Sequence, residues 1–203
     1  MADTVRLYIS AAPHLHLERE VLSRAITEVP TTLAWRIVQT PAAGEPADLE
    51  AAAQADLHIL VMSDDIQAPV GAEWYAAWRA GRTQVLFLRK NVPRTPAGVA
   101  FVRDMERRAA WRLYQDAADL RRQVLELLAE HILSSATYYE LSAAEAERLS
   151  EWQAQVRAAA RQVVDPTIGG AGASSVVFSV ERYVPSEGQL IEPPSPPAEA
   201  EPA

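Results

Sequence analysis

The chain has 203 residues, 49% of them hydrophobic, and a formal net charge of −8 at pH 7. This length and apolar content suffice for one domain of ordinary size with an appended segment. The acidic balance argues against nucleic-acid binding, and the absence of cysteine excludes disulfides and thiolate zinc sites. No apolar run approaches the roughly 20 residues that cross a bilayer, and no signal peptide is recognisable, so we expect a cytoplasmic protein without membrane contact.

Strand-like and helical segments alternate along the first two thirds of the chain. The apolar patterns predict strands at 5–10, 33–39, 57–62, 84–89 and 111–116. They predict helices at 15–29, 48–55, 72–80, 97–108 and 119–134. Pro69 and Gly71 are expected to keep the segment 63–71 irregular, so that the helix of the central unit begins after them.

This alternation is typical of a parallel sheet with helices on both faces. Five strands suit the flavodoxin-like order 2-1-3-4-5, in which the first and third strands are neighbours. The loops that follow Ser10 and Ser63 would then meet at the carboxyl edge of the sheet. Ligands of open α/β sheets bind at this position.

The character of the sequence changes after residue 135, the predicted end of the α/β domain. We expect one long helix at 141–164, within a segment 136–166, that either docks on its own domain or pairs with another helix. Ser142 and Glu145 form a capping-box pattern at its start. In the remaining part, 167–203, we expect a connector, a strand-like segment at 175–184 that could join a partner's sheet, and a Pro- and Glu-rich tail without fixed structure.

Glu73 is the main candidate for chemistry. It follows the central strand and is expected in the first turn of the next helix, near the carboxyl edge of the sheet. A carboxylate at this edge could act as a nucleophile or stabilise an oxocarbenium-like sugar cation. The alternative is a glutamate held at a helix start by the helix dipole alone.

Other polar and aromatic residues gather around the same predicted edge. The candidates for nucleotide binding are Ser10, Ala11, Asp64, Asp65 and Trp74. Arg19 and Glu20 are candidates for a pair that orients the site, or for a solvated helix face. His14 and His16 lack a third ligand at suitable spacing, so we expect no metal site, and His58 and His131 are expected to be structural.

Five motifs in order resemble an uncharacterised bacterial family of TIR-like domains. They are Y-I-S-A-A at 8–12, L-E-R-E at 17–20, A-D-L-H-I-L-V-M-S at 55–63, G-A-E-W-Y-A-A at 71–77 and Q-V-L-F-L-R-K at 84–90. The resemblance covers roughly residues 4–135. It implies a fold related to TIR domains and to nucleoside 2-deoxyribosyltransferases.

The resemblance also implies a function for Glu73. In those relatives a glutamate at the start of the helix after the third strand attacks or stabilises C1′ of a ribose, and Glu73 matches it by position. The implied activity is hydrolysis of the N-glycosidic bond of NAD or a related nucleotide, with NAD as substrate rather than cofactor, by an effector or signalling module of bacterial defence. Two alternatives stay open: a non-catalytic adaptor that self-associates through 141–164 and 175–184, and a nucleoside 2-deoxyribosyltransferase-like enzyme.

Overall fold

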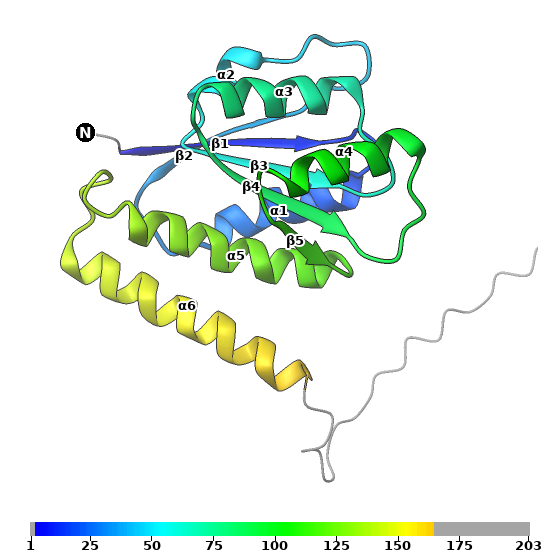
Figure 1. The fold of residues 1–203 in the computed structure, drawn as a ribbon. Helices are drawn as coiled ribbons and strands as arrows, with labels where there is room; N and C mark the ends of the chain where they lie inside the picture. The colour runs from blue at the N-terminus through cyan, green and yellow to red at the C-terminus, as the bar shows by residue number, and fades with distance from the viewer. Residues whose placement is uncertain (1–2, 165–203) are drawn as a thin grey trace, which may run out of the picture. The chain divides into compact units, whose positions relative to one another are not determined.

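A computed structural model describes residues 3–164, which form an α/β domain around one five-stranded parallel sheet (Figure 1). The strands are β1 (Thr4–Ala11), β2 (Ala34–Gln39), β3 (Leu57–Met62), β4 (Thr83–Arg89) and β5 (Trp111–Tyr114). Their order is β2-β1-β3-β4-β5, and every neighbouring pair is parallel. The predicted fold class and strand order are therefore confirmed.

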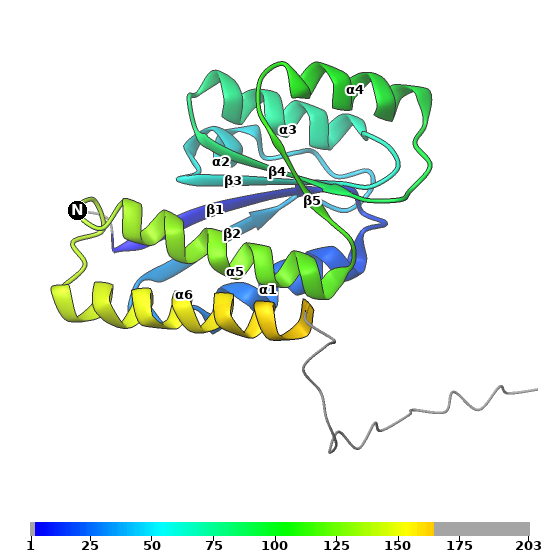
Figure 2. The same cartoon turned by 60° about the horizontal axis from the view of Figure 1, so that its bottom comes forward.

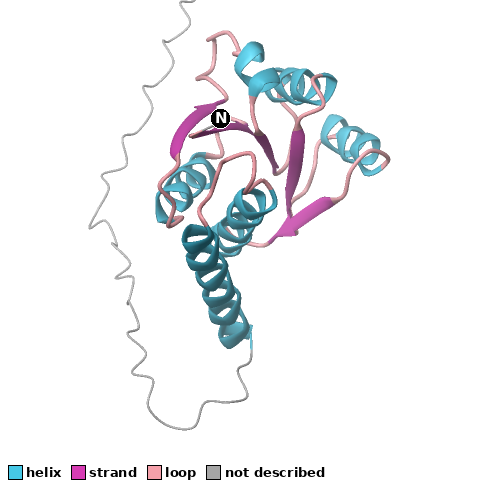
Figure 3. Cartoon of the chain, turned by 90° about the vertical axis from the view of Figure 1, so that its left-hand side faces the viewer, coloured by secondary structure: helices cyan, strands magenta, loops and turns pink. Residues whose placement is uncertain are grey.

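Helices cover both faces of the sheet (Figure 2). One face carries α2 (Leu49–Gln54), α3 (Ala68–Arg79) and α4 (Pro96–Glu106). The other face carries α1 (His16–Glu28) and α5 (Ala117–Ser134), with α6 (Ala143–Val164) packed outside α5. The view along the sheet in Figure 3 shows the two helical layers on either side of the strands.

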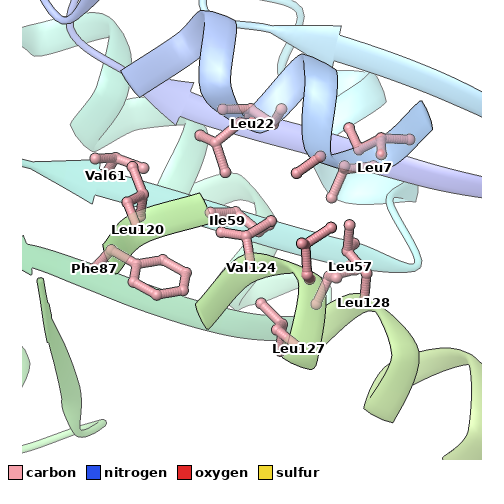
Figure 4. Close-up of a cluster of buried hydrophobic side chains, with 14 of the residues drawn as sticks. Leu7, Leu22, Leu57, Ile59, Val61, Phe87, Leu120, Val124, Leu127 and Leu128 are labelled. Carbon is pink, nitrogen blue, oxygen red and sulfur yellow. The ribbon is translucent and has the colours of Figure 1, made fainter. Parts of the chain in front are cut away.

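The alternation of side chains along the strands divides the interior into two layers. The apolar layer beneath α1 and α5 is the larger one and is drawn in Figure 4; it includes Leu7, Leu22, Ile59, Phe87, Val124 and Leu128. A second apolar cluster lies beneath α3 and α4, around Leu60, Trp74 and Leu86. Every residue of β3 is buried, as expected for the central strand of a parallel sheet.

Helix α3 begins earlier than predicted. It starts at Ala68, and Pro69 lies in its first turn. Proline is compatible with this position because the first N–H groups of a helix have no intrahelical partner and its φ angle suits the helix. The expectation that Pro69 and Gly71 keep this segment irregular is therefore wrong, and Glu73 lies in the second turn of α3 instead of the first.

Helix α6 docks on α5, which is the first of the two alternatives predicted for it. Leu149 is completely buried, and the Nε2 of Gln153 donates to the carbonyl of Glu126 at 3.2 Å. Ser142 and Glu145 form the predicted capping box: the Glu145 carboxylate accepts from the backbone N–H and hydroxyl of Ser142. The predictions for 167–203, including the strand-like segment 175–184, lie outside the described residues.

The helices of the described part offer no candidate for crossing a bilayer, because none between residues 3 and 164 is both long and apolar enough.

Candidate functional site

Glu73 lies between α3 and the sheet, and its side chain is 0% exposed. One carboxylate oxygen, Oε2, accepts two short hydrogen bonds. The hydroxyl of Ser10, near the end of β1, donates at 2.7 Å, and the hydroxyl of Thr40, directly after β2, donates at 2.6 Å. The carboxylate therefore joins α3 to the carboxyl ends of two neighbouring strands.

Each hydroxyl that contacts Glu73 has a second buried partner. The Oγ of Ser10 lies 2.9 Å from the Nε2 of His58, and the two side chains share one face of the sheet because β1 pairs with β3. The Oγ1 of Thr40 accepts the backbone N–H of Ala11 at 3.1 Å. Ala11 thus takes part through its backbone, while its side chain lies in the opposite, apolar layer.

Burial sets the electrostatics of this cluster. It raises the pKa of Glu73, an effect opposed by the hydrogen bonds from Thr40 and Ser10 and by the charge of Arg19. Burial also lowers the pKa of His58 to about 3, so its imidazole is neutral at physiological pH. The pKa of Tyr8 is raised, first by burial and then by the charge of Glu73. The site is consequently a buried cluster of polar groups around one carboxyl, in surroundings of low dielectric constant.

Three polar atoms of the cluster are buried without a hydrogen-bond partner: the Tyr8 hydroxyl, Oε1 of Glu73 and Nδ1 of His58. The Tyr8 hydroxyl is close enough to the carboxylate to feel its charge, but the two form no hydrogen bond of normal geometry. Buried polar groups normally find partners, and Tyr8 and Glu73 each shift the pKa of the other, so Nδ1 of His58 is the exception in this cluster.

Arg19 holds the end of β2 in place. Its Nη2 donates to the backbone carbonyl of Thr40 at 2.6 Å, and its Nε donates to the Oε1 of Gln39 at 3.0 Å. The predicted pairing of Arg19 with Glu20 does not form, because Glu20 points outward and pairs with Arg24 on the surface of α1. Of the predicted pair, Arg19 contacts this cluster through Thr40 and Glu20 does not.

Asp64 and Asp65 lie in the loop after β3 and do not contact Glu73. The Oδ1 of Asp64 lies 3.0 Å from the Nε2 of His14 in the loop after β1, so these side chains connect the two loops across the predicted ligand-binding edge. Asp65 accepts the hydroxyl of Thr95 at 2.5 Å, at the start of α4. Both aspartates therefore organise loops in this structure.

Trp74 points away from Glu73. Its ring stacks on Trp78 and meets the edge of Phe101, in the apolar cluster beneath α3 and α4. Successive residues of a helix point about 100° apart, so α3 can direct Glu73 toward β1 and β2 while Trp74 faces β3 and β4. Trp74 and Glu73 therefore do not line a common pocket, which corrects the prediction for Trp74.

The sequence indicated Ser10, Ala11, Arg19 and Glu73, which the fold brings together, but it did not single out Tyr8 and Thr40. The alternation of β1 places Tyr8 and Ser10 on one face, so Tyr8 could have been inferred. The position of Thr40 depends on where β2 ends, and the Pro-, Ala- and Gly-rich segment 40–48 does not show this end in the sequence. Within residues 3–164, no three acidic, histidine or cysteine side chains are grouped as a metal site would require.

A groove of about 430 Å³ lies elsewhere, between α1, α5 and α6. Its apolar wall consists of Leu125, Trp152, Val156 and Ala159, and polar side chains, among them Arg121 and Glu28, border it.

In comparisons with known proteins, no family model matches the chain and no curated protein matches it closely enough to be called a relative.

Proposed function

We propose that this chain is a TIR-like module that acts by self-association rather than by turnover. The supporting observation is the complete burial of Glu73, whose Oε2 is already engaged by Ser10 and Thr40. A catalytic carboxylate must come within about 3–3.5 Å of the reacting carbon. Burial of Glu73 beneath α3 favours a structural role for it, in which it fastens that helix to β1 and β2.

The groove beside α6 is the surface that we assign to a second copy of the chain. Trp152 and Val156 are only partly buried although α6 is docked on α5. Aromatic residues and arginine are enriched at protein interfaces, and this groove combines Trp152 with Arg121. A second molecule seated there would cover the apolar wall that the domain leaves open.

The test is the mass of the full chain in solution across a wide concentration range, by light scattering. Association should increase with concentration and should be lost in Val156→Asp. Ser150→Asp is the matched control, because this exposed residue of the same helix is not part of the groove. A chain that stays monomeric at all concentrations, or equal association of both variants, would contradict the proposal.

Hydrolysis of the N-glycosidic bond of NAD is the second candidate. It is favoured by one observation: Oε1 of Glu73 is buried without a hydrogen bond of normal geometry, and burial raises the carboxyl pKa. Glycosidases use carboxyl groups tuned in this way. Glu73 is completely buried, so access to the carboxyl would require the groups packed around it to move.

This candidate is tested by incubating the full chain with NAD and measuring released nicotinamide. Turnover that disappears in Glu73→Gln and persists in Glu50→Gln, an exposed glutamate of α2, would establish the enzyme and contradict the purely structural role of Glu73. Absence of turnover at high protein concentration would leave the self-association proposal standing.

A further inference from the structure

The hydroxyl of Ser10 lies between two buried groups and has one hydrogen to donate. Its Oγ is 2.7 Å from Oε2 of Glu73 and 2.9 Å from Nε2 of His58. Ser10 and His58 are both 0% exposed, so bulk water cannot serve as an alternative partner for either. The direction of the hydrogen bonds must therefore follow from the groups of the cluster.

Thr40 helps to fix this direction. Its hydroxyl oxygen accepts the N–H of Ala11, and the hydroxyl hydrogen is left to donate to Oε2 of Glu73. The two distances to Oε2, 2.6 and 2.7 Å, match those of hydroxyl groups that donate to an ionised carboxylate, roughly 2.5–2.7 Å. Oε2 is accordingly an acceptor from both Thr40 and Ser10.

If Ser10 donates to Glu73, it can only accept from His58. The hydrogen of the neutral imidazole is then on Nε2, and Nδ1 is a bare acceptor. We propose that His58 is a positioning residue: its Nε2–H donates to Ser10, which turns the Ser10 hydroxyl onto Oε2 of Glu73 and leaves Oε1 as the carboxylate oxygen that neither Ser10 nor Thr40 contacts. Burial, which lowers the pKa of His58 to about 3, keeps the ring neutral as this arrangement requires.

The reverse direction would need a proton on Oε2 of Glu73, which already accepts from Thr40, and a hydrogen on Nδ1 of His58. Nδ1 is unpaired in either arrangement, so the two short distances to Oε2 decide the direction. The other charged or titratable groups acting on this cluster are Arg19 from α1, which stabilises the carboxylate, Tyr8 from β1 and, through Tyr8, Asp48 before α2. Burial sets the pKa of His58, and neither Glu73 nor Asp48 raises it.

The direction of this hydrogen-bond chain does not depend on turnover. Only its catalytic consequence, that Oε1 would be the reacting oxygen, rests on the second candidate function. The inference can therefore fail or hold independently of any activity toward NAD.

The first test is the tautomer of His58 in the unmodified full chain, read near neutral pH from the ¹⁵N shifts and proton couplings of its ring by NMR. The signals are assigned by their loss in His58→Gln. The expected result is a neutral ring protonated at Nε2. A ring protonated at Nδ1, or an imidazolium, would overturn the proposal.

The second test compares His58→Gln, which retains an N–H donor near the position of Nε2, with His58→Leu, which has none. The pKa of Glu73 is read from its carboxyl ¹³C shift. It should shift upward in His58→Leu and stay closer to the unmodified value in His58→Gln. The control is His131→Gln, a change at a histidine that bonds Tyr139 and not this cluster. Equal Glu73 pKa values in the two His58 variants would contradict the positioning role, even if both variants fold.

Discussion

The first turn of α4 approaches the loop after β3 so closely that a Cβ added to Gly98 would lie 2.6 Å from the carbonyl oxygen of Asp64. Asp64 is fixed there because the same carbonyl accepts the N–H of Thr95. The closest approach at Gly98 is therefore to backbone, and the side chains of Met62 and Thr95 come next, at 3.2 and 3.3 Å.

This contact makes Gly98→Ala destabilising. Backbone has to move to admit the methyl group, and overpacking of this kind costs about 1–3 kcal/mol. Gly71→Ala is the matched control: the nearest atom to its added Cβ is Ile66 Cγ1 at 3.8 Å, and its place inside α3 should yield a gain of up to about 1 kcal/mol. Urea denaturation measures both, and equal effects of the two substitutions would contradict the interpretation.

The pair of Arg6 and Asp56 should contribute more to stability than the surface ion pairs. The Asp56 carboxylate accepts the backbone N–H, Nε and Nη2 of Arg6, and its side chain is 8% exposed. Asp56→Ala removes all three partners and leaves a part-buried backbone N–H unpaired, so we expect a loss of about 2 kcal/mol in the free energy of unfolding.

Glu20→Ala provides the contrast for this prediction. Glu20 pairs with Arg24 on the surface of α1, where both side chains are more than half exposed. Exposed pairs contribute about 0–1 kcal/mol. Denaturation curves that show equal losses for Asp56→Ala and Glu20→Ala would refute the ranking.

Stability should depend on pH through Glu73. The pKa of this carboxyl is raised in the fold above its ordinary value of 4.5, so folding favours the protonated form. Its contribution to stability is fully present below about 4.5 and is lost as the pH rises through the folded pKa. The stability of the unmodified chain relative to Glu73→Gln should therefore decrease above pH 4.5. A constant difference across this range would show that burial does not shift the carboxyl.

The contribution of His58 to stability should depend on pH in the opposite direction to that of Glu73. Burial lowers its pKa from 6.5 to about 3, so folding favours the neutral ring. The contribution is present above pH 6.5 and is lost as the pH falls toward 3. Stability should fall less steeply over this interval in His58→Gln than in the unmodified chain. Calorimetry or denaturation at several pH values measures the difference, and parallel curves would contradict it.

The fold class could be predicted because it follows from patterns within short segments of the sequence. The buried run of β3 and the alternation of strands with helices led to the fold class, and the usual order of that class matches the order of the sheet. The start of α3 was missed because Pro69, which usually interrupts a helix, is compatible with its first turn.

The site was only partly predictable. Ser10 and Glu73 were indicated by their places at the carboxyl edge, but their shared contact with Thr40 depends on the end of β2, and the one with His58 depends on the register between β1 and β3. The direction of the Trp74 side chain likewise depends on the rotation of α3 about its axis. These are three-dimensional relations that no single segment encodes.

The docking of α6 has a practical consequence for shortened versions of this protein. With Leu149 inserted against α5 and Gln153 bonded to the backbone of Glu126, the helix serves as the outer wall of that side of the domain. A fragment that ends near residue 140 would expose the apolar surface of α5 that α6 covers. Aggregation of such a fragment would then result from the loss of α6 and would not be evidence of natural self-association.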